Sequence, residues 1–389
     1  MLEFHKLTAD YQQALLRQVI PFWLINSPDR LCGGYFDLLG AAGMPIDADK
    51  HVALQAEQTW AFAWLYTTFD GQPRWLEHAR HGGAFLSRFA HDDTLRCYAD
   101  LDRRGRPVAA ATTQAPNVYT LMAYAQLYRA TQEDEWAMLA KALLTDTLAW
   151  HDTYRDEPNV STLSSRPVRH LREWALVFRA VLSMQPLLDE ESWKDMAAGL
   201  VEEIQTVFAD RRTDTLRTMA LPDGGYVNTP DGRQIDVGLT LQLITYLLDY
   251  CALVPNRKLT RQVAGWCLWL CEQAWEPAAG GLVRYIDHKG LPLIWPDTGE
   301  RWAWVALEGL SALLKSYHHT RQPDCLKWFR RIHDYVFAHF PDSKAPGWFP
   351  VIDAQRVPML ALKALPSVGC YSQIRCLTEI SQLLGRYAT

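Results

Sequence analysis

Apolar residues recur at spacings of three and four over most of this chain, which places them on one face of an α-helix. Residues 117–128, which read NVYTLMAYAQLY, are typical. Residues 239–248 are apolar on nearly every side, as expected of a helix that is buried all round. The same spacing predicts further helices over 174–187, 239–253, 263–275, 304–317 and 325–337.

A short phrase recurs between these helical segments and predicts β-hairpins. Residues 34–45, 281–292 and 347–358 each contain an apolar strand, a turn, and a proline that stops strand pairing. Residues 101–107 repeat the tail of the phrase, with an Asp-x-x-Gly turn, and residues 224–232 hold a weaker copy.

The distances between these copies set the number of units. Positions 40 and 102 are 62 residues apart, 102 and 287 are 185 apart, and 287 and 353 are 66 apart. The middle gap is about three times the others, so about six units fit, the third with only a loop at 156–166. Each unit has room for two helices, which predicts an all-α fold, an (α/α)6 barrel with short β-hairpins at one end. An open α-solenoid is the alternative.

The repeat runs through the whole chain, so we expect one domain over residues 1–389. The net charge of −5 gives no basic footprint for nucleic acid. Apolar stretches stay short of the roughly 18 to 20 residues of a membrane span, and the first residues lack the basic and apolar regions of a signal peptide. We therefore expect a cytoplasmic protein with neither a nucleic-acid nor a membrane partner.

Cysteine and aromatic residues point to a packed core and to a cavity. The eight cysteines contain no Cys-x-x-Cys pair, and Cys267 and Cys271 lie one helical turn apart in an apolar segment, so reduced core thiols are expected rather than a metal site. The 16 tryptophans are several times the usual number. Core packing accounts for most of them. Because the C–H faces of a sugar stack on indole, several are also expected to line a carbohydrate-sized cavity.

Several motifs resemble the N-acylglucosamine 2-epimerase family, which includes cellobiose 2-epimerases and mannose isomerases. The resemblance covers nearly the whole chain. It rests on the sequence GGYFD at 33–37, Gln55, Ala56 and Gln58 ahead of Trp60, the residues Pro167, His170, Leu171 and Glu173, the pair Trp304 and Glu308, and Lys363 followed by Tyr371 and Arg375.

The resemblance implies an (α/α)6 barrel, in agreement with the repeats. It implies an enzyme that interconverts epimers, or aldose and ketose forms, of unphosphorylated sugars without a metal or another cofactor. In this family two histidines, assisted by glutamates and an arginine, move the proton next to the sugar carbonyl. Histidine suits that role because its pKa is near neutral.

The chain departs from the family pattern at the catalytic positions. Leu239 and Ser372 stand where the resemblance places the two histidines. Gln242 stands in place of a glutamate, and Glu57 in place of the arginine. Leu239 cannot exchange a proton, and a serine hydroxyl is a poor base at neutral pH, so the sequence predicts a rearranged catalytic group.

The remaining motif residues supply candidates for that group. His170 lies three residues before Glu173, on one helix face, where Glu173 could polarise it. A hydrogen-bonded structural pair and, for Glu57, a salt bridge to a nearby arginine are the structural alternatives. The candidate catalytic residues are His170, Glu173, Glu308 and Glu57, and the candidate substrate-binding residues are Trp60, Tyr119, Arg169, Trp304, Tyr371 and Arg375.

Three functions remain open from the sequence. The first is an epimerase- or isomerase-like enzyme that acts on a small sugar or a similar polar ring. The second is a different reaction in the same pocket, such as hydrolysis or elimination by paired carboxylates. The third is a non-catalytic sugar-binding or partner protein. A homodimer is the default expectation for the assembly.

Overall fold

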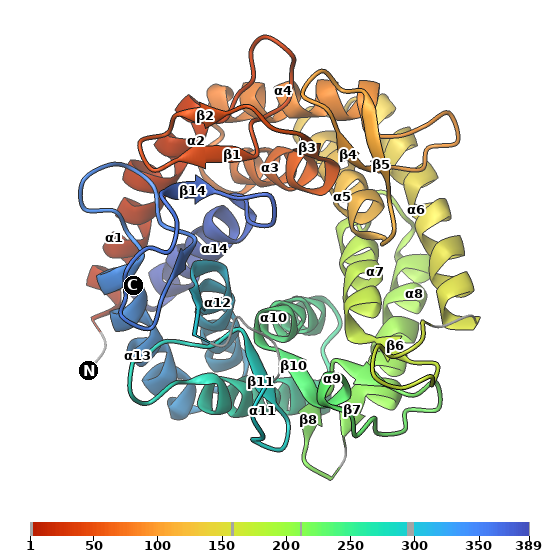
Figure 1. Ribbon diagram of the computed structural model, residues 1–389, viewed down its shortest axis with the longest axis vertical. Helices are drawn as coiled ribbons and strands as arrows, with labels where there is room; N and C mark the ends of the chain where they lie inside the picture. Colours follow the sequence, from red (N-terminus) through yellow and green to blue (C-terminus); the bar gives the residue numbers. More distant parts are fainter. Residues whose placement is uncertain (1–2, 157–158, 211, 294–298, 389) are drawn as a thin grey trace.

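The computed structural model describes residues 3–156, 159–210, 212–293 and 299–388. Its long helices form two concentric rings (Figure 1). The inner ring contains α3 (Val52–Leu65), α5 (Ala115–Thr131), α7 (Leu171–Ser183), α10 (Val237–Leu253), α12 (Ala303–Thr320) and α14 (Tyr371–Ala388). The outer ring contains α1 (Phe4–Gln13) with its continuations η1 (Ala14–Val19) and α2 (Ile20–Asn26), then α4 (Pro73–Phe89), α6 (Asp134–Asp156), α8 (Glu190–Glu203), α11 (Arg257–Ala274) and α13 (Pro323–His339). Short helical turns complete the chain at η2 (Tyr66–Asp70), η3 (Ile204–Phe208) and α9 (Pro230–Arg233).

The inner ring is closed. Each inner helix packs against the next one, from α3 through α5, α7, α10 and α12 to α14, and α14 packs back against α3. This closure confirms the predicted (α/α)6 barrel and excludes the alternative fold, an open α-solenoid. It follows from the sequence pattern, because inner helices such as α10 are apolar on nearly all sides and lie between the axis and the outer ring.

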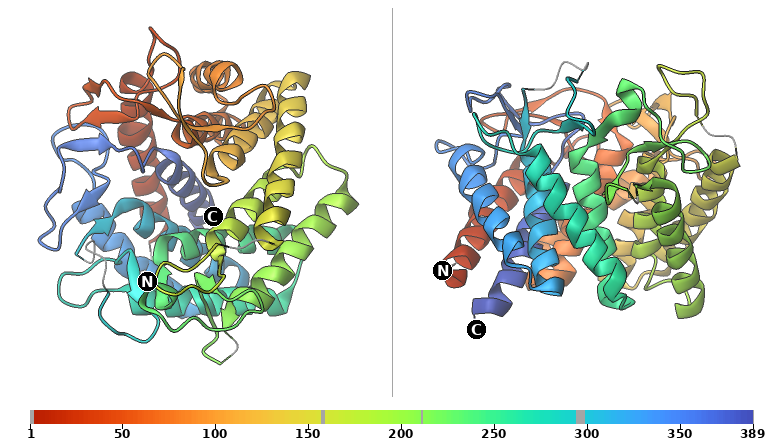
Figure 2. Two further views of the ribbon diagram at one scale, coloured as in Figure 1. Left: turned by 45° about the vertical axis from the view of Figure 1, so that its right-hand side comes forward. Right: turned by 90° about the horizontal axis from the view of Figure 1, so that it is seen from below.

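Short strands gather at one end of the barrel (Figure 2, right). The predicted hairpins form at β1–β2 and β4–β5. The copy at 347–358 also closes on itself, through a bridge between Ile352 and Pro358, and its strand β13 pairs in addition with β12. At 281–292, β11 pairs instead with β10. Both β10 and β12 immediately precede an inner helix. The strands are β1 (Leu38–Gly40), β2 (Pro45–Ile46), β3 (Lys50–His51), β4 (Tyr98–Leu101), β5 (Pro107–Ala110), β6 (Arg169–His170), β7 (Ala209–Asp210), β8 (Thr215–Leu216), β9 (Met219–Ala220), β10 (Gln234–Asp236), β11 (Tyr285–Asp287), β12 (Arg301–Trp302), β13 (Val351–Ile352) and β14 (Leu362–Ala364).

These pairings hold the entrances of the inner helices together. Strand β3 leads into α3 and pairs with β4, and β1 pairs with β14 near the other end of the chain. The weak copy at 224–232 contributes a turn but no strand among its residues. In the predicted loop at 156–166, residues 157 and 158 lie outside the described residues. The repeated phrase therefore both closes local hairpins and ties neighbouring units to one another.

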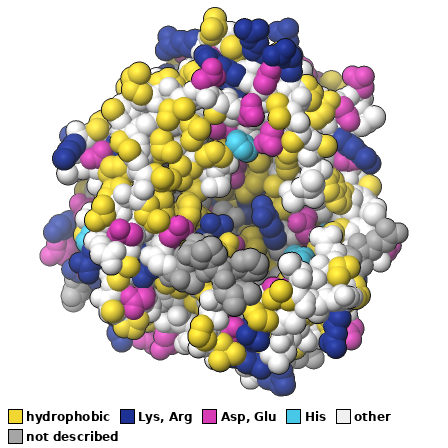
Figure 3. Space-filling model, viewed as in Figure 1, with side chains coloured by type: hydrophobic (Ala, Val, Ile, Leu, Met, Phe, Trp, Pro, Cys, Tyr) yellow, Lys and Arg dark blue, Asp and Glu magenta, His cyan; other side chains and the backbone are white. Residues whose placement is uncertain are grey.

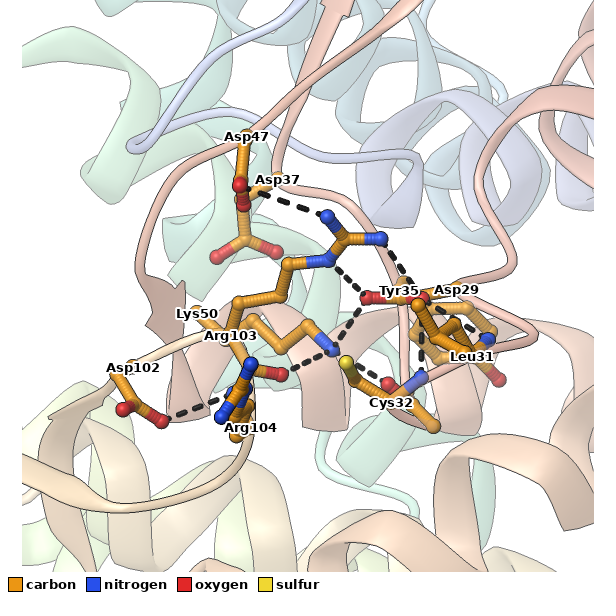
Figure 4. Close-up of polar contacts among 12 residues, drawn as sticks. Asp29, Leu31, Cys32, Tyr35, Asp37, Asp47, Lys50, Asp102, Arg103 and Arg104 are labelled. Atoms are coloured by element: carbon orange, nitrogen blue, oxygen red, sulfur yellow. Dashed lines mark hydrogen bonds and ion pairs between the residues drawn. The ribbon is translucent and has the colours of Figure 1, made fainter.

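A buried ion cluster ties the first two units together (Figure 4). The Lys50 ammonium, whose side chain is 1% exposed, lies 3.1 Å from Asp29 Oδ2 and donates to the carbonyl of Arg103 at 3.0 Å. The Arg103 guanidinium donates to the same Asp29 oxygen at 2.8 Å. Burial alone would raise the pKa of Asp29, but these bonds hold the pKa well below its usual range. The cluster fixes the residue before His51.

We expect Asp29→Asn to lower the free energy of unfolding by about 2 kcal/mol at neutral pH, because Lys50 then loses a charged acceptor. Since the folded pKa of Asp29 is lowered, its contribution is complete above the unfolded value of about 4 and is lost as the pH falls below it. Urea unfolding at pH 7 and at pH 3.5 measures both effects. The control is Asp334→Asn, which breaks an exposed pair with Arg330. An equal loss in both variants would contradict the structural role of the cluster.

Candidate functional site

A cavity of about 440 Å³ lies at the hairpin end of the barrel. All six inner helices contribute residues from their first two turns to its wall, so the cavity lies on the barrel axis. The face drawn in Figure 3 is hollowed at its centre, and lysine or arginine side chains are visible inside the hollow. The volume falls in the range of small-molecule sites.

Glu57 lies in the cavity wall on α3. The side-chain amides of two nearby residues on α3 bind other partners: Gln55 donates a hydrogen bond to Asp37, and Gln58 donates one to Ser27. Burial and the nearby charge of Glu308 raise the pKa of Glu57 to about 7, although a hydrogen bond with Tyr119 and the charge of Arg179 oppose the rise. A carboxyl group with this pKa can either accept or release a proton at neutral pH.

A chain of hydrogen bonds runs from Glu57 across the cavity floor. Tyr119, hydrogen-bonded to Glu57, accepts a hydrogen bond of 2.5 Å from Arg179. Arg179 also donates to the amide oxygen of Gln242. The Gln242 amide nitrogen then donates to Glu308 Oε1 at 2.9 Å. Gln242, at a position where the resemblance predicts a glutamate, is thus a neutral link between the Arg179 guanidinium and the Glu308 carboxylate.

Glu308 is completely buried beneath the cavity floor. Ser372, which does line the cavity, donates to Glu308 Oε1 at 2.7 Å. Arg375, 1% exposed, binds the other carboxylate oxygen and also donates to Glu379 at 2.9 Å. The two residues that stand at expected catalytic positions, Gln242 and Ser372, therefore share one buried carboxylate.

His51 is a cavity residue that the sequence analysis did not identify. It precedes α3, and its Nδ1 lies 3.0 Å from Asp37 Oδ2. Its Nε2 lies 3.6 Å from Asp100 on β4. The hydrogen bond to Asp37 raises the pKa of His51 above its ordinary value, and the charge of Asp100 adds to this, although burial opposes the rise. This carboxylate–histidine pair is the usual arrangement that orients an acid–base imidazole.

The structure brings only some of the predicted residues into the cavity wall. Glu57, Tyr119, Trp304 and Tyr371 line it. Trp60 lies behind Tyr371, with ring centroids 5.0 Å apart, and stacks on Trp64. Glu308 and Arg375 support the floor from below.

His170, Glu173 and Arg169 are not among the residues of the cavity wall. His170 lies in β6, opposite Met219. Glu173 is buried near Gln114 and His151, and burial raises its pKa. Arg169 donates to the carbonyl of Arg155. The predicted relay through His170 and Glu173 therefore gains no support from the geometry, because the face of α7 that lines the cavity carries Arg172, Leu176 and Arg179.

The described residues hold neither a cluster of metal ligands nor a membrane-spanning helix. No group of three or more His, Cys, Asp or Glu side chains in them has the arrangement of a metal site. None of the helices in these residues is long and apolar enough to cross a lipid bilayer.

The whole chain is similar to known proteins. The N-acylglucosamine 2-epimerase (GlcNAc 2-epimerase) family profile matches residues 34–368. The N-acylglucosamine 2-epimerase of Bos taurus is 28% identical over 382 residues, which cover 95% of this chain and 89% of the bovine protein. The human N-acylglucosamine 2-epimerase is 27% identical over 382 residues, covering 95% of this chain and 88% of its own.

Solved structures show the same fold. Cellobiose 2-epimerase from Spirochaeta thermophila superposes with a TM-score of 0.85 at 17% identity, covering 99% of this chain and 98% of its own. A D-mannose isomerase has a TM-score of 0.81 at 16% identity, covering 96% and 97%. The double helical ring is thus the architecture of a class of (α/α)6-barrel proteins. Within that class, this chain belongs to the N-acylglucosamine 2-epimerase family.

Proposed function

We propose that this protein is a sugar epimerase or isomerase that transfers protons with Glu57 and His51 instead of the histidine pair expected from its family. The observation that carries the proposal is the Glu57 carboxyl group, which lies in the cavity wall with its pKa raised to about 7. His51 has its pKa raised by Asp37 and lies in the same wall. The Glu57 carboxylate is suited to accept a proton at neutral pH, and the His51 imidazolium is suited to donate one.

The reaction needs only proton transfers, in two stages. Glu57 takes the proton from the carbon next to the carbonyl of an open-chain sugar, while His51 protonates the carbonyl oxygen to give an enediol. If His51 then takes the proton back from that oxygen while a proton from water adds to the same carbon on its other face, the epimer forms. If the other hydroxyl group loses its proton while the neighbouring carbon gains one, the ketose forms. The steps are redox-neutral overall, so the proposal requires no redox cofactor.

The buried residues would support this chemistry from behind. Tyr119 and Arg179 hold Glu57 and place a positive charge nearby, which would stabilise the negative charge that develops on the sugar as Glu57 removes the proton. Ser372 and Gln242 present polar groups to sugar hydroxyls while Glu308 orients them. Trp304 and Tyr371 supply aromatic faces to the cavity.

The hydrolytic alternative has less support. A glycosidase needs two carboxyl groups that face the scissile bond. Glu308, the partner that the sequence suggested for Glu57, lies behind Gln242 and Ser372 with both of its oxygens engaged. A carboxylate held in this way is suited to orienting its neighbours.

The test is incubation of the protein in D₂O with mannose, glucose, N-acetylmannosamine, cellobiose and uronic acids, followed by proton NMR. Loss of the C2 proton signal from any of these sugars is the expected result. A new reducing end or an unsaturated product would favour the alternative reactions. Ligand-dependent stabilisation without turnover would favour a binding protein.

The exchange rate should also depend on pH. We expect kcat/KM to rise as the pH increases through about 7, where Glu57 loses its proton and becomes the base. It should fall again as His51 loses the proton that it donates, and the hydrogen bond to Asp37 raises the pKa of His51 above its ordinary value. His51→Gln should abolish the descending limb and keep the ascending one, and a profile unchanged in that variant would contradict the role of His51.

A further inference from the structure

Two arginines lie in the cavity wall on the side away from Glu57. Arg172 is in the first turn of α7, and Arg284 immediately precedes β11, which pairs with the strand leading into α10. In the order of the inner ring, α10 is three helices from α3 in either direction, so the two lie across the axis from each other (Figure 1). The cavity therefore has an acid–base side at α3 and a cationic side near α7 and α10.

The cationic side carries more positive than negative charge. Its carboxylate is Asp236, which caps α10 by accepting a hydrogen bond of 3.0 Å from the Leu239 amide. Both arginines attract this carboxylate. Burial raises the pKa of Asp236 above its ordinary value, although the charges of both arginines oppose the rise. Glu173, which also attracts Arg172, is buried outside the cavity wall. Within the wall, two guanidinium groups face one carboxylate, which leaves room for one more anionic group.

Aromatic rings hold Arg284 in place. Its guanidinium carbon lies 5.2 Å from the ring centroid of Trp302 and 5.8 Å from that of Trp304. Its Nε is buried and has no hydrogen-bond partner among the residues that the structure describes. A guanidinium fixed in this way binds planar oxyanions with little further loss of side-chain freedom.

We propose that the substrate of this site is an anionic sugar whose acid group binds between Arg172 and Arg284, with its reacting carbonyl end directed toward Glu57 and His51. This inference rests on the proposed function for the reacting end, but the binding of the anion does not depend on turnover. A carboxylate, as in a hexuronic acid, and a phosphate monoester share the required chemistry. Both accept paired hydrogen bonds from a guanidinium.

The experiment compares matched ligands by isothermal titration calorimetry. Glucose, glucuronate and glucose 6-phosphate are titrated into the wild type, Arg284→Met, Arg172→Met and Arg166→Met. Arg166 is an exposed arginine near α7 that is outside the cavity wall, so its replacement controls for the loss of one positive charge. We expect at least one anion to bind about tenfold or more tightly than glucose. The tighter binding of the anion should disappear in Arg284→Met and Arg172→Met and should persist in Arg166→Met. It should weaken in high salt.

Each outcome decides the inference. Tighter binding of glucuronate would assign a carboxylate, and tighter binding of glucose 6-phosphate a phosphate. Equal binding of glucose and both anions, or an equal loss of all ligands in Arg284→Met, would overturn it. Deuterium exchange with neutral sugars alone would leave the proposed function standing without the anion site. Arginine-dependent binding of an anion without exchange would leave the anion site standing without the proton transfer.

Discussion

Glu57→Gln should slow deuterium incorporation at the sugar C2 by about 100- to 10,000-fold, the usual effect of removing a general base. Glutamine keeps the shape of the side chain and can still accept a hydrogen bond from Tyr119, but it cannot take up a proton at neutral pH. The rate of loss of the C2 proton signal in D₂O measures the effect. The matched control is Glu272→Gln, an exposed glutamate on α11, which should keep the wild-type rate.

The same variant should be more stable than the wild type in alkaline solution. The folded protein keeps a proton on Glu57 that the unfolded chain releases between about pH 4.5 and about pH 7, so wild-type stability falls as the pH rises through that window. Above pH 7, Glu57→Gln should gain about 1–3 kcal/mol over the wild type, and near pH 4 it should gain nothing. Slow exchange together with lowered stability at pH 8 would indicate a damaged fold and contradict the assigned role.

Glu308→Ala should cost about 3–5 kcal/mol of folding free energy, because it leaves the buried guanidinium of Arg375 without one of its two carboxylate partners. Gln242 and Ser372 lose their acceptor in the same step. Urea unfolding followed by circular dichroism measures the loss. We expect the cavity floor to loosen as well, so sugar binding should weaken in parallel.

An exposed ion pair provides the comparison. Asp334→Ala removes one partner of a pair with Arg330 in which both side chains are more than half exposed, and should cost less than about 1 kcal/mol. Glu308→Gln keeps the size of the side chain and part of its hydrogen bonding, so its cost in folding free energy should lie between those of Glu308→Ala and Asp334→Ala. A cost for Glu308→Ala that is no larger than that of Asp334→Ala would show that the network under the cavity contributes little to folding.

The barrel could be predicted because its determinants are local and repeated. The segment 239–253 is apolar all round, which only a helix of the inner ring requires, and 263–275 shows the one-sided pattern of an outer helix. The partners of the strands could not be predicted in the same way. The copy at 281–292 looks like a hairpin, but β11 pairs with β10, about fifty residues earlier, because that strand presents its edge at the entrance to α10.

The site was less accessible to sequence reasoning, for a physical reason. Sequence spacing shows which residues share a helix face, but the neighbours of His51 come from elsewhere in the chain. Asp37 belongs to the preceding hairpin, and Asp100 arrives through the pairing of β3 with β4. His170, in contrast, stands in a recognisable motif and yet lies in β6, outside the cavity wall.

The amide of Gln242 couples the charged residues on either side of it. An amide can accept from Arg179 with its oxygen and donate to Glu308 with its nitrogen, whereas a glutamate at the same position would set two carboxylates against each other. A glutamate at position 242 would therefore be harmful unless its neighbours changed too. Arg179, Gln242 and Glu308 are coupled in this sense, so the effect of replacing any one of them depends on the identity of the other two.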